Sequence, residues 1–452
     1  MVETDTIFAL SSGRPPAAIA VVRISGPRAR FALEAMIGKV PEPRRAALAR
    51  VRNADGASID SALALFFPGP HSETGEDMAE LQLHGGRAIV AAVLATLGGL
   101  DGFRPADAGE FTRRAFANGK LDLTAVEGLA DLIYAETEAQ RRQAYGHYAG
   151  RLGRRAEAWR ARLVEALALV EARIDFADEG DVPDNLIGPA LASARTLRQE
   201  IAGALTDDRR GERLRDGLVV AIAGPPNAGK SSLMNRVAQR EAAIVTPVPG
   251  TTRDVIEVHL DLDGYPVTVL DTAGIRETDD PVEQEGVRRA RARAAAADLV
   301  LWVVDAALAT SEDEAPAMGA ASLWMIRNKI DLVDSCARQP PGPPAGEGRD
   351  SYAVSALTGA GIDDLVAALA AHARDAFGSG EDVLISRERH RMALRETVEA
   401  LDRALAEAAE APREDIVAEE LRLAARALGR LTGRVDVEEI LEVIFRDFCV
   451  GK

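Results

Sequence analysis

The residues of this chain that could do chemistry begin with a glycine-rich loop. Residues 224–232 read Gly-Pro-Pro-Asn-Ala-Gly-Lys-Ser-Ser and directly follow the apolar run 218–223. A strand that passes through such a loop into a helix offers backbone N–H groups and the positive end of a helix dipole to phosphate groups. We therefore expect Lys230 to reach the β- and γ-phosphates of a nucleotide and Ser231 to ligate Mg²⁺.

Three later segments indicate which nucleotide is bound. In chain order they are Asp271-Thr272-Ala273-Gly274, Asn328-Lys329-Ile330-Asp331 and Ser355-Ala356-Leu357. The carboxylate of Asp331 can accept hydrogen bonds from N1–H and the N2 amino group of guanine, whereas adenine offers no such donor pair. Asp271 ends an apolar run and suits a second Mg²⁺ anchor, and Gly274 can give its N–H to the γ-phosphate. The order of these segments outweighs the alternative of four unrelated turns.

The sequence thus predicts a site that binds and hydrolyses GTP. We expect its contacts to come from the phosphate loop, two switch segments and two base-recognition segments. The predicted GTP-binding residues are Asn227, Ala228, Gly229, Lys230, Ser231, Ser232, Thr246, Pro247, Val248, Pro249, Gly250, Thr251, Thr252, Asp271, Thr272, Ala273, Gly274, Asn328, Lys329, Ile330, Asp331, Ser355, Ala356 and Leu357.

Composition limits the classes of protein that the chain can be. Its 452 residues carry a net charge of −17, which argues against broad nonspecific binding of nucleic acid. Any RNA contact is therefore expected to be local or helped by a partner. The two cysteines, Cys336 and Cys449, cannot build a disulfide framework, and no apolar run is long enough to span a bilayer. We expect a soluble, cytoplasmic protein with no membrane contact.

Sequence patterning places the nucleotide module inside a helical region. Residues 1–120 alternate β-like runs with helical patterns and predict an α+β domain. Residues 121–215 and 379–452 are rich in Ala, Leu and Glu with helical periodicity, and residues 216–378 hold the nucleotide motifs. We expect a multidomain α/β protein: an N-terminal α+β domain, a discontinuous helical domain and an inserted Ras-like P-loop GTPase domain.

Beyond these motifs, the chain resembles the family of tRNA-modification GTPases named MnmE or TrmE over essentially its whole length. The features that carry the resemblance are Asp5-Thr6-Ile7, the run Gly109-Glu110-Phe111-Thr112-Arg113-Arg114-Ala115-Phe116-Ala117-Asn118-Gly119-Lys120, Pro249-Gly250-Thr251-Thr252-Arg253-Asp254, and Phe448-Cys449-Val450-Gly451-Lys452. Their combination is specific, because Gly-Thr-Thr-Arg-Asp alone is shared with related bacterial GTPases. Ala108, where the family often has Pro, and Val450, where it often has Ile, are small departures.

The resemblance implies a function and partners. The family is implied to form a homodimer through its N-terminal domain and to bind 5-formyltetrahydrofolate or a related one-carbon folate there. With the FAD- and NADH-using protein MnmG, it adds a carboxymethylaminomethyl or aminomethyl group at C5 of the wobble uridine, U34, of certain tRNAs. GTP hydrolysis is implied to drive G-domain dimerisation and conformational change. A ribosome-assembly GTPase and a signalling switch that needs an external activating protein remain as alternatives.

The hydrolytic residues also follow from the resemblance. In Ras-like enzymes a Gln after Asp-x-x-Gly orients the attacking water, but Ile275 occupies that place and cannot form a hydrogen bond. Glu283 matches the water-orienting Glu of the family, with a solvated switch carboxylate as the alternative. The K⁺ ligands are implied to be Asn227, Thr246, Val248 and Thr251, and the Mg²⁺ ligands to be Ser231 and Thr252. Asn227 could instead merely cap the phosphate loop.

The folate site rests on the same resemblance. Arg23, Glu80, Lys120 and Lys452 match folate-contact positions, where a cation suits the glutamate tail and a carboxylate suits the guanidine-like edge of the pterin. Each of these residues taken alone could be a surface ion pair. Cys449 is a candidate functional thiol, with an inert cysteine as the alternative.

Overall fold

The computed structural model describes residues 5–175, 186–206, 209–240, 257–271, 297–308, 322–333, 350–378, 384–410, 413–435, 444–445, 448 and 451. The chain folds into two compact units. One holds residues 1–130, 147–199 and 396–452, and the other holds residues 131–146 and 200–395. The four-part division predicted from sequence, at 120, 215 and 378, stays a prediction.

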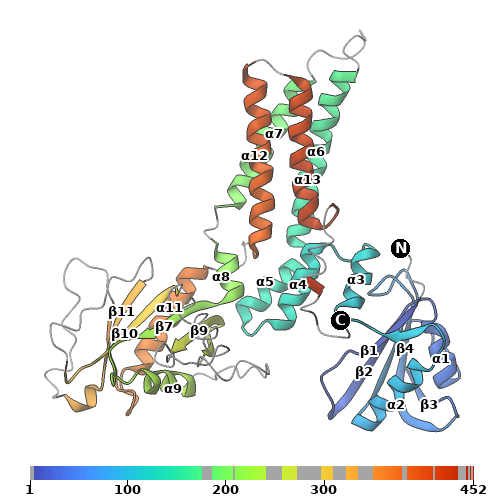
Figure 1. Ribbon diagram of the computed structural model, residues 1–452, viewed down its shortest axis with the longest axis horizontal. Coiled ribbons are helices and arrows are strands. Elements are labelled where there is room, and N and C mark those ends of the chain that lie inside the picture. The colour runs from blue at the N-terminus through green and yellow to red at the C-terminus, as the bar shows by residue number, and fades with distance from the viewer. Residues whose placement is uncertain are drawn as a thin grey trace, which may run out of the picture. The chain divides into compact units, whose positions relative to one another are not determined.

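The N-terminal part of the first unit is a mixed sheet with helices. Its elements are β1 (Thr6–Leu10), β2 (Ala17–Ser25), α1 (Ala29–Ile37), β3 (Ala47–Arg52), β4 (Ser58–Phe67), β5 (Met78–Gly85), α2 (Arg87–Gly98), β6 (Phe103–Pro105) and α3 (Glu110–Ala117). The strand order is β3-β4-β5-β2-β1-β6, in which β1 and β6 are parallel and the other pairs antiparallel. Helices α1 and α2 cover one face, where alternate strand residues such as Val22, Ala64 and Leu81 are buried (Figure 1).

The opposite face of this sheet is covered differently. Over β1, Ile7 and Ala9 pack with Phe111 of α3. Towards β3 the strands leave apolar side chains at the surface: Leu48 and Leu63, which face each other across β3 and β4, are 72% and 42% exposed. One face therefore carries the core, and the other combines the small α3 contact with an exposed apolar area.

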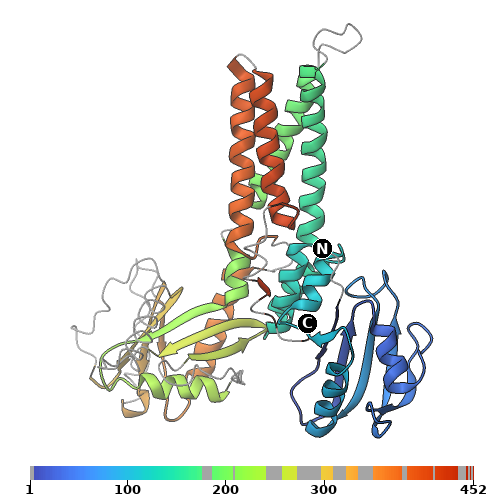
Figure 2. The ribbon, with the colours of Figure 1, turned by 45° about the vertical axis from the view of Figure 1, so that its right-hand side comes forward.

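Long helices build the rest of the first unit, and parts of four of them belong to the second. They are α4 (Leu123–Tyr134), α5 (Glu138–Tyr148), α6 (Arg151–Asp175), α7 (Ile187–Ala204), α12 (Glu388–Glu410) and α13 (Glu414–Thr432). Figures 1 and 2 both show α6, α7, α12 and α13 side by side. The helical periodicity of Trp159, Leu163, Leu167 and Val170 predicts one buried face of α6, and in the structure Leu167 is half-buried and the other three are buried. The segments before and after residues 216–378 thus share one bundle, as a discontinuous helical domain requires.

The second unit contains the nucleotide module as a second sheet. Its elements are α8 (Arg210–Asp216), β7 (Leu218–Ala223), α9 (Lys230–Arg240), β8 (Glu257–Leu262), β9 (Tyr265–Asp271), β10 (Leu299–Asp305), β11 (Ser322–Asn328), η2 (Ile330–Leu332), β12 (Ser351–Ala353) and α11 (Ile362–Phe377). The strand order is β12-β11-β10-β7-β9-β8, parallel except for the β8–β9 hairpin. Helices α8, α9 and α11 pack on one face of this sheet (Figure 1). In such a sheet, sites form at the carboxyl ends of the parallel strands.

Candidate functional site

The phosphate loop connects β7 to α9, as its spacing predicts. Lys230 begins α9, and its ammonium group donates to the carbonyl oxygens of Gly224, at 3.0 Å, and Pro225, at 2.9 Å. Asn227 has a φ of 61°, a left-handed conformation that tolerates Asn better than most residues. The loop therefore holds its own cation in place and leads directly into a helix N-terminus, the arrangement that binds phosphate groups.

Asn328 fastens the phosphate loop to the base-recognition segments. This residue ends β11 and is only 1% exposed. Its side-chain N–H donates to the Ala228 carbonyl at 2.9 Å, and its side-chain oxygen accepts from the Ala356 N–H at 3.0 Å. A Cβ on Gly229 would come within 2.3 Å of the same amide nitrogen, so the loop needs glycine at that position. Three segments far apart in the sequence thus meet at one amide.

The base-recognition residues are held by hydrogen bonds of their own. The Ser355 hydroxyl donates to a carboxylate oxygen of Asp331 and accepts from the Thr358 N–H at 3.1 Å. Lys329 pairs with Asp305 at 2.7 Å. Burial by itself would raise the pKa of the Asp305 carboxyl, but hydrogen bonds from Lys329 and the Ala307 N–H hold that pKa below its ordinary value. Asp331 is therefore oriented as a hydrogen-bond acceptor, the property that guanine recognition requires.

Ser231 and Asp271 lie together as the magnesium prediction requires. The Ser231 hydroxyl donates to a carboxylate oxygen of Asp271 at 2.6 Å, and Asp271 is 1% exposed. Neighbouring ligands of an octahedral Mg²⁺ ion lie about 2.9 Å apart, so a hydroxyl and a carboxylate at this separation fit two adjacent positions. Among the residues that the structure describes, no group of three or more His, Cys, Asp or Glu gathers around a metal site. Such a site would be completed by water and phosphate oxygens.

Several predicted residues lie outside the described part of the chain. They are Thr246, Pro247, Val248, Pro249, Gly250, Thr251, Thr252, Thr272, Ala273, Gly274, Glu283, Cys449 and Lys452. Of the four K⁺ ligands implied by the resemblance, only Asn227 is described. The roles assigned to these residues stay predictions.

Two of the predicted folate residues contact each other. Arg23 of β2 and Glu80 of β5 are cross-strand partners, and the Arg23 guanidinium donates to a Glu80 carboxylate oxygen at 3.1 Å. A second carboxylate, that of Glu73, pairs with the same guanidinium at 2.9 Å, and the Arg23 side chain is 17% exposed. Arg23 therefore lies between two carboxylates, where its guanidinium can hold the Glu80 carboxylate in a fixed orientation.

The third predicted folate residue follows α3. Lys120 lies just beyond this helix, and its N–H donates to the Ala115 carbonyl at 2.8 Å. Its side-chain Cε lies 3.3 Å from where a Cβ on Gly75 would be. The described part of the C-terminal segment also lies on this domain, because the Ser11 hydroxyl donates to the Gly451 carbonyl at 2.8 Å.

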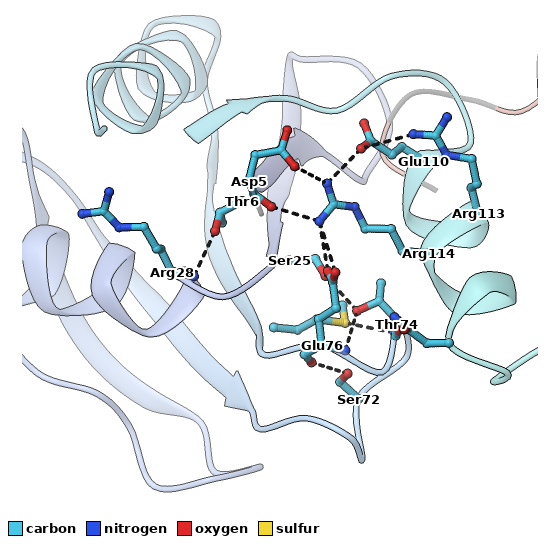
Figure 3. Close-up of polar contacts among 12 residues, drawn as sticks. Asp5, Thr6, Ser25, Arg28, Ser72, Thr74, Glu76, Glu110, Arg113 and Arg114 are labelled. Carbon is cyan, nitrogen blue, oxygen red and sulfur yellow. Dashed lines mark hydrogen bonds and ion pairs between the residues drawn. The ribbon is translucent and has the colours of Figure 1, made fainter. Parts of the chain in front are cut away.

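A buried ion-pair cluster lies beside these residues and was not predicted from the sequence (Figure 3). Arg114, 3% exposed, pairs with Asp5 at 3.2 Å, with Glu76 at 3.2 Å and with Glu110 at 3.0 Å. Arg104 also pairs with Asp5 and donates to Glu110 at 2.8 Å. Two motifs quoted for the resemblance, around Asp5 and Glu110, thus contact each other. The four-residue spacing of Glu110 and Arg114 on one helix is the signal that could have suggested such a pair.

Comparison with known proteins decides the family. A profile of the MnmE helical domain matches residues 123–449, and one of the GTP-binding protein TrmE N-terminus matches residues 6–120. The chain is 57% identical to the tRNA modification GTPase MnmE of Rhodopseudomonas palustris strain BisB18, covering 99% of each chain. It is 58% identical to the protein of that name from Bradyrhizobium sp. strain BTAi1, again over 99% of each. The chain belongs to the MnmE family of tRNA modification GTPases.

Membership in the MnmE family confirms several predictions. The resemblance, the multidomain α/β fold and the enzyme class, a GTP hydrolase of tRNA modification, are borne out. Among solved structures, the G domain of the T. maritima FeoB iron transporter matches 34% of this chain and 98% of its own length, at 24% identity and a TM-score of 0.24. Within the described ranges, none of the helices is long and apolar enough to cross a membrane.

Proposed function

We propose that this MnmE-family chain couples K⁺-stimulated hydrolysis of GTP to modification of the wobble uridine U34 of certain tRNAs. In this proposal MnmG supplies the redox chemistry, and the product carries a carboxymethylaminomethyl or aminomethyl group at C5. One observation carries the proposal: the phosphate loop and the predicted base-recognition segments are joined at Asn328, and in the N-terminal domain the Arg23–Glu80 pair and Lys120 both contact the segment of residues 73–75. The first supports GTP as substrate, and the second supports a folate as one-carbon donor.

For hydrolysis, each described residue has a distinct part. Asp331, held by Ser355, would bind the guanine edge, and Lys230 would neutralise the β- and γ-phosphates. Ser231 and Asp271 would hold Mg²⁺, which offsets charge on the phosphate oxygens when it is bound. Glu283 would orient the attacking water because Ile275 cannot. A K⁺ ion held at Asn227, Thr246, Val248 and Thr251, with Thr252 completing the Mg²⁺ ligands, would meet the remaining transition-state charge.

For the folate, the ion pair suggests a division of roles. Glu80 would accept hydrogen bonds from the guanidine-like edge of the pterin, because Arg23 already holds this carboxylate in place. Lys120 and Lys452 would meet the carboxylates of the glutamate tail. Cys449 would lie near the folate as a functional thiol.

A homodimer formed through the N-terminal domain is part of the proposal. Its support is the exposed apolar area on the sheet face opposite α1 and α2, where Ile19, Leu48 and Leu63 are 60%, 72% and 42% exposed. Large apolar side chains that gather on one face often mark a protein interface. Dimeric G domains would then associate during each GTP cycle, in the cytoplasm where tRNA is modified.

The deciding experiment analyses wobble uridine in tRNA from cells that lack this protein, with and without complementation. We expect the C5 modification to disappear and to return with the wild-type gene. A reconstitution with MnmG, GTP, the folate and unmodified tRNA provides the second arm, read by mass spectrometry. Unmodified uridine in the presence of every component would overturn the function, whereas wild-type product from Cys449→Ser would remove only the thiol.

A further inference from the structure

A short segment, residues 72–76, connects the three described folate positions. These positions come from three separate elements: Arg23 from β2, Glu80 from β5, and Lys120 from the end of α3. The segment ends one residue before β5 and contacts β2 through Glu73 and Glu76, β5 through the Thr74 N–H and the Met78 sulfur, and Lys120 through Gly75. We propose that this segment positions the folate-binding residues, and that Glu76 is the positioning residue that fixes it. The inference rests on the folate site proposed above.

On its inner side the segment is held by buried polar groups, which Figure 3 shows together. The Glu76 carboxylate accepts from the Ser25 hydroxyl at 2.7 Å and pairs with Arg114 at 3.2 Å. Ser25 and Thr74, both fully buried, share a further hydrogen bond of 2.7 Å. Hydrogen bonds between ionised groups are the stronger and more directional kind. Glu76 therefore anchors the segment to both β2 and α3.

On its other side the segment contacts the folate positions themselves. Glu73 pairs with Arg23 at 2.9 Å, and Arg23 in turn pairs with Glu80. Gly75, at a φ of 82°, lies against Lys120, and a Cβ there would fall 3.3 Å from the Lys120 Cε and 2.8 Å from the Asn118 Cβ. The space taken by Lys120 thus depends on where the backbone of Gly75 runs.

A hydrogen bond from Asn118 also connects the backbone next to Lys120 to this segment. The side chain of Asn118, two residues before Lys120, donates to the Thr74 carbonyl at 2.8 Å. The backbone that follows α3, from Asn118 to Lys120, and the segment of residues 72–76 are therefore expected to move together. Because a binding constellation must be held to within about 0.5 Å, a shift of this segment would separate Lys120 from Glu80 and weaken a ligand that needs both.

The test measures binding of 5-formyltetrahydrofolate to the full chain by calorimetry. Glu76→Gln keeps an acceptor for Ser25 but removes the charge that pairs with Arg114. We expect its dissociation constant for the folate to rise about tenfold, since a charge-assisted hydrogen bond is lost. Gly75→Ala, which changes no charge, should weaken the folate comparably by crowding Lys120. Lys120→Ala serves as the reference for loss of a direct contact.

Two controls separate positioning from stability. Asn53→Ala removes the hydrogen bond from the Ala57 N–H in the turn between β3 and β4, so it destabilises the same domain away from the segment. Asn53→Ala should leave folate affinity unchanged, and GTP hydrolysis should be normal in Glu76→Gln, Gly75→Ala and Asn53→Ala. Wild-type folate affinity in both Glu76→Gln and Gly75→Ala, with a loss in Lys120→Ala, would overturn this inference alone. A wild-type chain that does not bind the folate would overturn the folate site and the inference together.

Discussion

Asn328 donates its side-chain amide to the carbonyl of Ala228, a residue 100 positions earlier in the chain. The same side chain accepts from the Ala356 N–H, so one buried amide joins the phosphate loop to both base-recognition segments. In the proposed assignment, guanine recognition and phosphate binding therefore depend on the same side chain. A substitution in the base-recognition segments should therefore also weaken binding of the phosphate groups.

Removing this amide should weaken both the fold and the nucleotide site. Asn328→Ala leaves the Ala228 carbonyl and the Ala356 N–H without their buried partner, at a cost of about 2–4 kcal/mol in the free energy of unfolding of the G domain. GTP should also bind more weakly. Oxidation of the buried Met234 across a urea series, followed by mass spectrometry, reports unfolding of this domain within the full chain. Leu332→Ala, at a side chain 65% exposed, should change neither property.

Asp331→Asn should change which base is bound. The amide can pair with O2 of xanthine but loses the charged acceptor for guanine, so the dissociation constant for GTP should rise about tenfold or more while xanthosine triphosphate gains. Ser355→Ala should weaken GTP less, because it removes only the hydroxyl that orients Asp331. Nucleotide titrations measure both. An unchanged preference for GTP in Asp331→Asn would contradict the base assignment.

Hydrolysis should be faster in K⁺ than in Na⁺, and Glu283→Ala should lose turnover while it still binds GTP. The reasons are Ile275 in place of a water-orienting side chain and Asn227 in the phosphate loop. Steady-state rates in matched salts, with Glu285→Ala as the neighbouring control, test both. Equal rates in the two salts would remove the cation from the proposal, and full activity in Glu283→Ala would remove the glutamate.

Whether a feature could be predicted from the sequence depends on how far apart in the chain its residues lie. The passage from β7 through a glycine loop into α9 was predicted, because a strand, a glycine turn and a helix start are set by local spacing. The contact between Arg23 and Glu80 could not be predicted in this way. The two residues are 57 positions apart, and they meet only through the register of β2 and β5. Sequence analysis placed both in one site only through the family resemblance.

The buried ion-pair cluster around Arg114 was not predicted from the sequence, for a different reason. Charged residues are rarely buried, so nothing in the local sequence favours burial of Glu110 and Arg114. Their burial depends on Asp5 and Glu76 arriving from other elements, which no local pattern encodes.

Asn328 was predicted as a nucleotide residue, but its hydrogen bond to Ala228 appears only when β11 and the phosphate loop are placed side by side.

The cluster gives the N-terminal domain a specific response to acid. Burial by itself would raise the pKa of the Glu110 carboxyl, but hydrogen bonds from Arg104, the Asp107 N–H and Arg114 outweigh it and hold the pKa below its ordinary value of 4.5. Because the pKa of Glu110 is lower in the folded state, its ionised carboxylate stabilises the domain fully at pH values above the ordinary pKa of 4.5. This stabilisation is lost as the pH falls through the folded-state pKa of Glu110.

Glu110→Gln should therefore lower stability at neutral pH and flatten its loss in acid. Removing one partner of a buried ion pair costs about 3 kcal/mol or more in the free energy of unfolding of this domain. Oxidation of Met36 and Met78, both buried there, measured across urea series at several pH values from 7 to about 3, follows this unfolding in the full chain. Glu42→Gln, which breaks an exposed pair with Arg45, should behave like wild type. If wild type and Glu110→Gln lost stability equally between pH 5 and about 3, the acid response would have to come from other carboxylates.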